Sequence, residues 1–154
     1  MGEDLWRCPV CGQTFVGRNM PHSCQVVPLQ THFEGRDELR AVFDAFVTAA
    51  EENGPITINA TKSRITLQAR MRFAAVEPRR DHLRAHLVLR RALESPRFIR
   101  VEHLPPDYFI HNLRLARPED VDAELRGWLA EAYLSGSRPR GARPAPGRRR
   151  RGSR

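Results

Sequence analysis

The stretch Lys62-Ser-Arg-Ile-Thr-Leu-Gln-Ala-Arg-Met-Arg-Phe73 decides the fold class of this chain. Apolar residues occupy every second position from Ile65 to Phe73, and polar or basic residues fill the positions between them. Successive side chains of a strand point to opposite faces of a sheet, so the pattern predicts one apolar and one basic face. The apolar face needs a cover. The pattern fits one long strand or two strands with a bend near Arg70–Arg72.

A helix with one apolar side is expected before this stretch. Apolar residues between Leu39 and Ala50 recur at helical spacing, and Gly54-Pro55 ends the pattern. The run Thr31–Glu34 fits a capping box, after which the helix either continues through Gly35 or restarts near Asp37.

A second helix is expected near the end of the chain. Pro118–Asp120 supplies a proline and two acids, which favour the first turn of a helix. An apolar stripe follows between Val121 and Tyr133. Both helices would be acidic outside and apolar inside, so both would cover the apolar face of the sheet.

All three cysteines of the chain lie in a short N-terminal segment, and a histidine accompanies them. Cys8 and Cys11 form a C-x2-C turn that lets two thiolates meet at one ion, and Gly12 permits the tight return of the backbone. A distal His-x-Cys completes a Cys3His set, which is typical of structural zinc. The expected Zn²⁺ ligands are Cys8, Cys11, His22 and Cys24. Four protein ligands leave no open position, so the metal would be structural and not catalytic.

Two alternatives to this ligand set stay open. His32 could replace His22 as the fourth ligand, because the His22–Cys24 spacing is shorter than usual. The cysteines could also be free thiols or a redox pair, although no βαβ pattern surrounds them.

These elements define the expected fold class and domains. Further alternating runs at 56–60, 83–89, 98–104 and 108–115 predict more strands. We therefore expect an α+β fold: two layers, with a mostly antiparallel sheet of about five strands covered on one face by two helices. A zinc knuckle at residues 1–27 precedes this α+β domain at 28–137. An arginine-rich tail at 138–154 lacks large apolar residues and is expected to be disordered.

Charge is distributed unevenly along the chain, whose formal net charge is +8. Residues 138–154 hold eight arginines and no acid. Residues 60–117 contain 13 basic and 5 acidic side chains, whereas acids outnumber bases in 28–59 and in 118–137. The sheet region is therefore basic, while the helical segments are acidic.

The basic face of the sheet is the candidate site for anions. Arginine presents a planar fork of donors that suits phosphate groups. The expected anion-binding residues are Lys62, Arg64, Arg70, Arg72 and Arg84. The alternative is a solvated face, because 25 of the 26 basic residues are Arg and this bias extends over the whole chain.

No pattern in the chain indicates a reaction. It contains no P-loop, nucleophile elbow or dinucleotide fingerprint, and the acids are expected on the helices, away from the basic face. We assign no catalytic residue and lean against an enzyme. His111 alternates with Phe109 and Leu113, which favours a hydrogen-bonded core histidine over a catalytic one.

The sequence therefore favours a small zinc-containing accessory protein that binds nucleic acid or another polyanion through its basic sheet face and its tail. One alternative is a binding or enzymatic domain for a small anion, such as a nucleotide or a phosphorylated metabolite. Another is an interaction module whose zinc knuckle docks a protein partner. The N-terminus has no secretory signal and no apolar run could span a membrane, so a cytoplasmic location and no membrane partner are expected.

Several blocks also resemble a known family. Cys-Pro-Val-Cys-Gly and the distal His-Ser-Cys resemble a zinc-ribbon-like N-terminus of bacterial proteins. The blocks Thr61–Arg70 and Tyr108–Leu115, together with Pro118–Leu125, resemble the domain of unknown function 5655 family. The resemblance covers about residues 6–135. It supports the α+β fold and implies no established activity.

Overall fold

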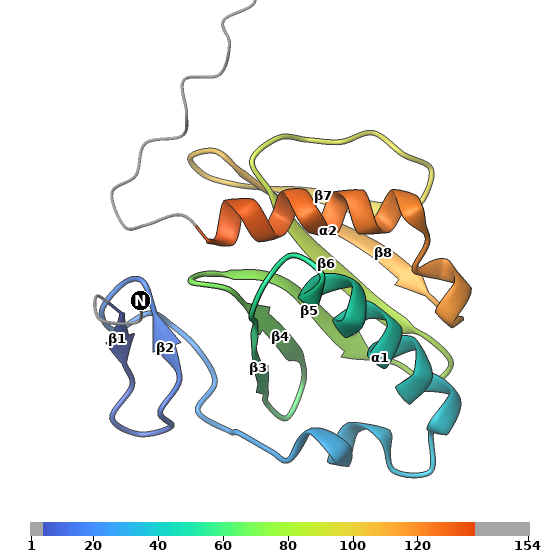
Figure 1. Ribbon diagram of the computed structural model, residues 1–154. Coiled ribbons are helices and arrows are strands. Elements are labelled where there is room, and N and C mark those ends of the chain that lie inside the picture. Colours follow the sequence, from blue (N-terminus) through green and yellow to red (C-terminus); the bar gives the residue numbers. More distant parts are fainter. Residues whose placement is uncertain (1–4, 138–154) are drawn as a thin grey trace, which may run out of the picture.

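The computed structural model describes residues 5–137, in which one main sheet carries two helices on one face (Figure 1). The expected disordered tail at 138–154 lies outside the described residues. The main sheet has six strands, all antiparallel, in the order β3-β4-β5-β6-β8-β7. Their bounds are Thr57–Ala60 (β3), Ile65–Gln68 (β4), Arg72–Pro78 (β5), Leu83–Leu89 (β6), Phe98–Leu104 (β7) and Tyr108–Leu115 (β8). The α+β prediction is confirmed.

The stretch from Lys62 to Phe73 forms two strands joined by a tight bend. β4 ends at Gln68, β5 begins at Arg72, and the pairing register shifts between Leu67 and Gln68. The bend accounts for the sixth strand of the sheet. The apolar alternation is present as expected, since Ile65 and Leu67 are fully buried and Phe73 is 1% exposed.

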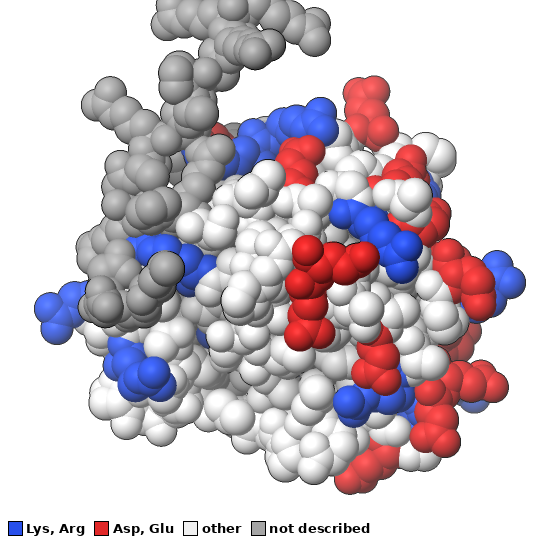
Figure 2. Space-filling model, in the orientation of Figure 1, with Lys and Arg blue, Asp and Glu red and all other residues white. Residues whose placement is uncertain are grey.

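Both helices pack on the same face of the sheet. Helix α1 (Asp37–Glu51) contacts β6 and α2, and helix α2 (Ala123–Gly136) contacts β5 and β6. Acidic side chains gather on the outer surface of this helical layer (Figure 2). The fully buried leucines beneath the helices come from β4, β6 and β8; they are Leu67, Leu83, Leu87, Leu89, Leu113 and Leu115. Within residues 5–137, no helix lies over the opposite face (Figure 1).

Helix α1 begins at the expected restart near Asp37, whereas α2 begins later than the sequence suggests. Leu29–Phe33 forms a separate 3-10 helix that includes Thr31, and α1 restarts at Asp37 after Gly35, whose φ is +66°. The capping box at Thr31 is therefore wrong. Pro118–Asp120 forms a second 3-10 turn, while α2 starts at Ala123.

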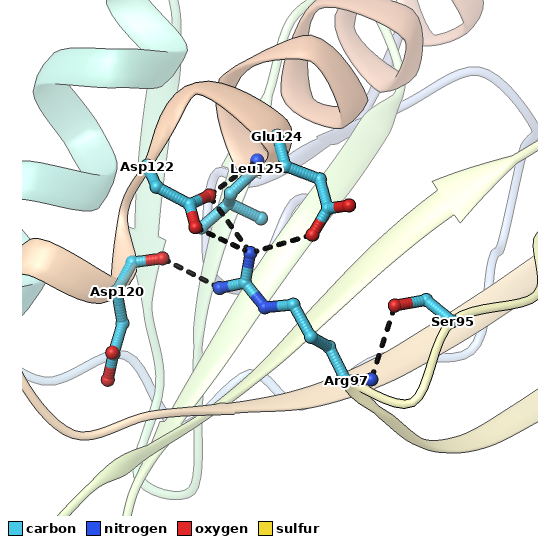
Figure 3. Close-up of polar contacts among 6 residues, drawn as sticks. All are labelled: Ser95, Arg97, Asp120, Asp122, Glu124 and Leu125. Atoms are coloured by element: carbon cyan, nitrogen blue, oxygen red, sulfur yellow. Dashed lines mark hydrogen bonds and ion pairs between the residues drawn. The ribbon is translucent and has the colours of Figure 1, made fainter.

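Two contacts fix the start of α2. Asp122 is its N-cap, because its carboxylate accepts a 3.0 Å hydrogen bond from the Leu125 N–H. Arg97 lies between Asp122, Glu124 and the Asp120 carbonyl, as Figure 3 shows. Its guanidinium donates to these oxygens over 2.7–3.2 Å. A cation before β7 thus anchors the acidic first turn of the helix to the sheet.

The other end of α2 is tied to the β4–β5 bend. The backbone N–H groups of Arg70 and Met71 donate to the Gly136 carbonyl at 3.1 and 2.7 Å. A Cβ atom at Gly136 would lie 2.9 Å from Phe73 Cβ and 3.1 Å from the Met71 oxygen. Only glycine permits this close approach of helix and bend.

We expect Gly136→Ala to lower the free energy of unfolding by about 1–3 kcal/mol, because the new methyl group overpacks against backbone and Phe73. The matched control is Gly127→Ala in the middle of α2, where a Cβ meets nothing within 4 Å. That change should raise the free energy of unfolding by roughly 0.5–1 kcal/mol through helix propensity. Urea denaturation measures both. Shifts of the same sign would contradict the close approach.

Candidate metal centre and its contact with the sheet

Four side chains converge beside a small N-terminal hairpin, which consists of β1 (Trp6–Arg7) and β2 (Thr14–Phe15). The four are Cys8, Cys11, His22 and Cys24, and their ligand atoms all lie within 4.8 Å of one another. The Sγ atoms of Cys8 and Cys24 are 3.8 Å apart, and His22 Nε2 is 3.4 Å from Sγ of both Cys11 and Cys24. The group can therefore bind one metal ion. From here on, the knuckle means residues 6–24, the part of the expected 1–27 segment that holds the hairpin and the four ligands.

Backbone geometry holds the first two cysteines together. The Gly12 N–H donates to the Cys8 carbonyl at 2.9 Å, and the Cys8 N–H donates to the Gln13 carbonyl at 2.8 Å. Gly12 has a φ of +79°, a left-handed conformation that glycine adopts without strain. The C-x2-C turn is thus closed by its own hydrogen bonds.

His22 has the orientation of a metal ligand. Its Nδ1–H donates to the Met20 carbonyl at 2.6 Å, which leaves Nε2 facing the sulfur atoms. The same carbonyl raises the pKa of His22. His32 lies elsewhere, because its Nε2 is 2.7 Å from the Thr61 carbonyl oxygen. The structure places His22, and not His32, in the group.

The three thiols do not ionise equally in the absence of a cation. The Cys11 backbone N–H lowers the pKa of Cys8 to about 6. Desolvation and the neighbouring thiols raise the pKa of Cys24 to about 11. A bound cation would stabilise all three thiolates, so metal binding must displace protons from this group.

The fold beyond the knuckle corresponds to a family. The family model described as Domain of unknown function (DUF5655) matches residues 29–136. The chain belongs to this family. The matched residues begin after Cys24, so all four ligands precede the DUF5655 domain. No match is found among curated proteins or among solved structures. Within residues 5–137, no helix has both the length and the apolar character to cross a bilayer.

The knuckle docks on the uncovered face of the DUF5655 domain through polar residues of the opening stretch. Gln68 Nε2 donates to the backbone and side-chain oxygens of Thr14 at 3.1 and 3.2 Å. The Arg72 guanidinium lies 3.9 Å from the centroid of the Phe15 ring and donates to the Thr14 carbonyl at 3.3 Å. Gln68 is 2% exposed, so this contact is buried.

Gln13 connects the metal group to the sheet. Its Nε2 donates to Cys11 Sγ at 3.1 Å and to the Ser23 carbonyl at 2.8 Å. Its Oε1 accepts a 2.9 Å hydrogen bond from Arg72. A single amide therefore orients a metal ligand and bonds to a strand of the DUF5655 domain.

The residues expected to bind anions occupy different environments. Lys62 is exposed in the turn before β4, and Arg64 follows it with half of its side chain exposed. Arg70 lies in the β4–β5 bend, and Arg84 projects from β6 on the uncovered face. Arg72 lies under the knuckle, where burial lowers its pKa to about 10. The structure brings Arg64 and Arg72 together at one pocket, which the other three do not line.

One acid at the centre of this face was not expected from the sequence. Glu77 accepts hydrogen bonds from His86 at 2.9 Å and from Arg79 at 3.2 Å, and lies 3.5 Å from Arg64. The expectation that acids lie only on the helices is therefore wrong. No local signal in the sequence indicated this position, because four apolar residues precede Glu77 and the register shift in the pairing of β4 with β5 decides its face.

The expectation for His111 is confirmed. It is fully buried, its Nε2 accepts a 2.9 Å hydrogen bond from the Leu93 N–H, and its Nδ1 lies 3.2 Å from the Phe109 carbonyl. These contacts identify a core histidine with a structural role.

We expect His22→Ala to abolish stoichiometric metal binding, because it removes one of four ligands. His32→Ala is the matched control and should retain about one metal ion per chain. Elemental analysis after gel filtration, with chelator competition, measures both variants. Equal metal content in the two would contradict the ligand set.

Arg72→Ala should loosen the knuckle without releasing the metal, because it removes bonds to Gln13 and Thr14 and the cover of Phe15. We expect amide exchange in residues 6–24 to become roughly tenfold faster, equivalent to about 1–2 kcal/mol of local opening. Arg40→Ala, a change on α1 away from the knuckle, is the control. Unchanged exchange of the knuckle in Arg72→Ala would show that this contact does not hold it.

Proposed function

We propose that this member of the DUF5655 family is a small zinc-containing accessory protein that binds nucleic acid or another polyanion on the uncovered face of its main sheet. The observation that carries the proposal is the arrangement of arginines on this face. They come from neighbouring strands and from the turn before β4, and they are Arg64, Arg84, Arg100 and Arg114.

Three of these arginines form ion pairs that are weak enough for a phosphate group to replace the carboxylate partner. Arg64–Glu77 and Arg114–Asp81 measure 3.5 Å, and Arg100–Glu102 measures 3.4 Å, with half or more of each arginine side chain exposed. Pairs of this kind contribute about 0–1 kcal/mol. Phosphate groups offer bidentate partners and release counterions on binding, which favours exchange. The eight arginines of residues 138–154 would add electrostatic attraction.

Zinc is the proposed metal because the donor set and its spacing suit this ion. Tetrahedral zinc with Zn–S bonds of about 2.3 Å and Zn–N bonds of about 2.05 Å separates two sulfurs by about 3.8 Å and a sulfur from a nitrogen by about 3.6 Å. The corresponding separations here are 3.8 and 3.4 Å. Three thiolates and one imidazole would fill the coordination sphere, so zinc would stabilise the knuckle and leave no position for substrate. Reduced thiols are compatible with the proposed cytoplasmic location.

We expect the full-length protein to bind single-stranded oligonucleotides with a steep salt dependence, and a chain ending at residue 137 to retain weaker binding. In that shorter chain, Arg100→Ala with Arg114→Ala should reduce the slope of log K against log salt by about 1.4, because each arginine neutralises about one phosphate and a single strand contributes about 0.7 per phosphate. Fluorescence anisotropy across a salt series measures the slope.

The control pairs Arg40→Ala with Arg126→Ala, two arginines on the helical layer, and should leave the slope unchanged. If the chain ending at residue 137 does not bind at low salt, the sheet face has no part in binding. Equal slopes in the two double variants would lead to the same conclusion.

A further inference from the structure

A pocket of about 350 Å³ lies where the knuckle meets the uncovered sheet face. The knuckle contributes Phe15, Pro21, His22 and Ser23 to its wall, and the sheet contributes Arg64, Thr66 and Arg72. Sites for small ligands have volumes of about 300–1,000 Å³, so this pocket is large enough for a small metabolite. It exists only because the knuckle is docked.

The lining of this pocket is basic and rich in hydroxyl groups. Arg64 and Arg72 supply two guanidinium groups, and the hydroxyls come from Ser23, Thr61, Ser63 and Thr66. No carboxylate lines it among the described residues. By contrast, a pocket of about 460 Å³ at the start of α1 has three carboxylates in its lining, from Asp37, Glu38 and Asp81, beside the two arginines Arg36 and Arg80. The positive charge and the hydroxyl donors of the pocket at the knuckle therefore favour an anionic ligand.

Arg72 keeps its charge without a carboxylate partner. The partners of its guanidinium are neutral oxygens, namely Gln13 Oε1 at 2.9 Å, Thr14 O at 3.3 Å and Thr66 Oγ1 at 3.3 Å. No carboxylate pairs with it within residues 5–137. Those three bonds occupy three of its five N–H donors, which leaves two for a ligand.

Arg64 can turn toward a ligand without leaving an unpaired acid behind. Its contact with Glu77 is a loose 3.5 Å, and half of its side chain is exposed. Glu77 would keep its shorter bonds to His86 at 2.9 Å and to Arg79 at 3.2 Å. Breaking the Arg64–Glu77 pair therefore costs little.

We propose that this pocket binds a phosphate monoester group between Arg64 and Arg72. Two planar guanidinium forks match the oxygens of a doubly charged phosphate, and the hydroxyls supply further donors. The group can come from a small phosphorylated metabolite or from the phosphorylated end of a nucleic acid chain. The second source rests on the function proposed above, whereas the first does not.

The test is calorimetric titration of the full-length, metal-loaded protein at about 150 mM salt, a concentration chosen to screen the tail. The probes are adenosine monophosphate, ribose 5-phosphate and adenosine. We expect both phosphates to bind and adenosine not to bind. Arg64→Ala should weaken phosphate binding about tenfold or more, because it removes a charged bidentate donor. Arg126→Ala is the matched control, because Arg126 is equally exposed and pairs with Glu52 at the same 3.5 Å.

A second comparison, of 5′-phosphorylated and 5′-hydroxyl oligonucleotides, separates the two sources. A preference for the 5′-phosphate that disappears in Arg64→Ala supports a nucleic acid end. Mononucleotide binding without such a preference supports a metabolite. If no monophosphate binds and the two oligonucleotides bind equally, the pocket proposal is overturned while binding on the sheet face stands. Equally weakened binding in Arg64→Ala and Arg126→Ala also overturns it.

Discussion

The contact of Arg72 with the knuckle is the interaction on which the candidate sites of this protein depend. Arg72 is the first residue of β5. Its guanidinium lies over the Phe15 ring and donates hydrogen bonds to Gln13 and Thr14. The knuckle is too small to bury a core of its own, so the sheet supplies the missing surface. In return, the knuckle converts part of an uncovered sheet face into a walled pocket.

Features carried by local patterns were predictable from the sequence. The spacing of Cys8 and Cys11 implies convergent thiolates whatever follows in the chain, because the turn alone positions them. The alternation from Ile65 to Phe73 likewise predicts that Ile65, Leu67 and Phe73 face the core, since strand periodicity is a property of the backbone. The placement of two acidic helices over the apolar face followed from the same argument, because neither layer can bury its apolar side alone.

Features that depend on long-range pairing were not predictable. Gln68 and Arg72 were expected to face solvent or ligand, and nothing in their own neighbourhood indicates that residues 13–15 would cover them. The pattern alone does not decide between one long strand and two strands with a bend near Arg70–Arg72, because the alternation continues through the bend although the chain reverses direction. Glu77 was not expected on this face because its role depends on the register that places it between Arg64 and Arg84.

The Gly136 carbonyl, which accepts from both Arg70 and Met71, also fixes the point at which the chain leaves the described fold. That point lies at the β4–β5 bend, which is flanked by Gln68 and Arg72, the two residues whose side chains bond to the knuckle. The described fold therefore ends beside this bend, where α2 meets the strand that contacts the knuckle.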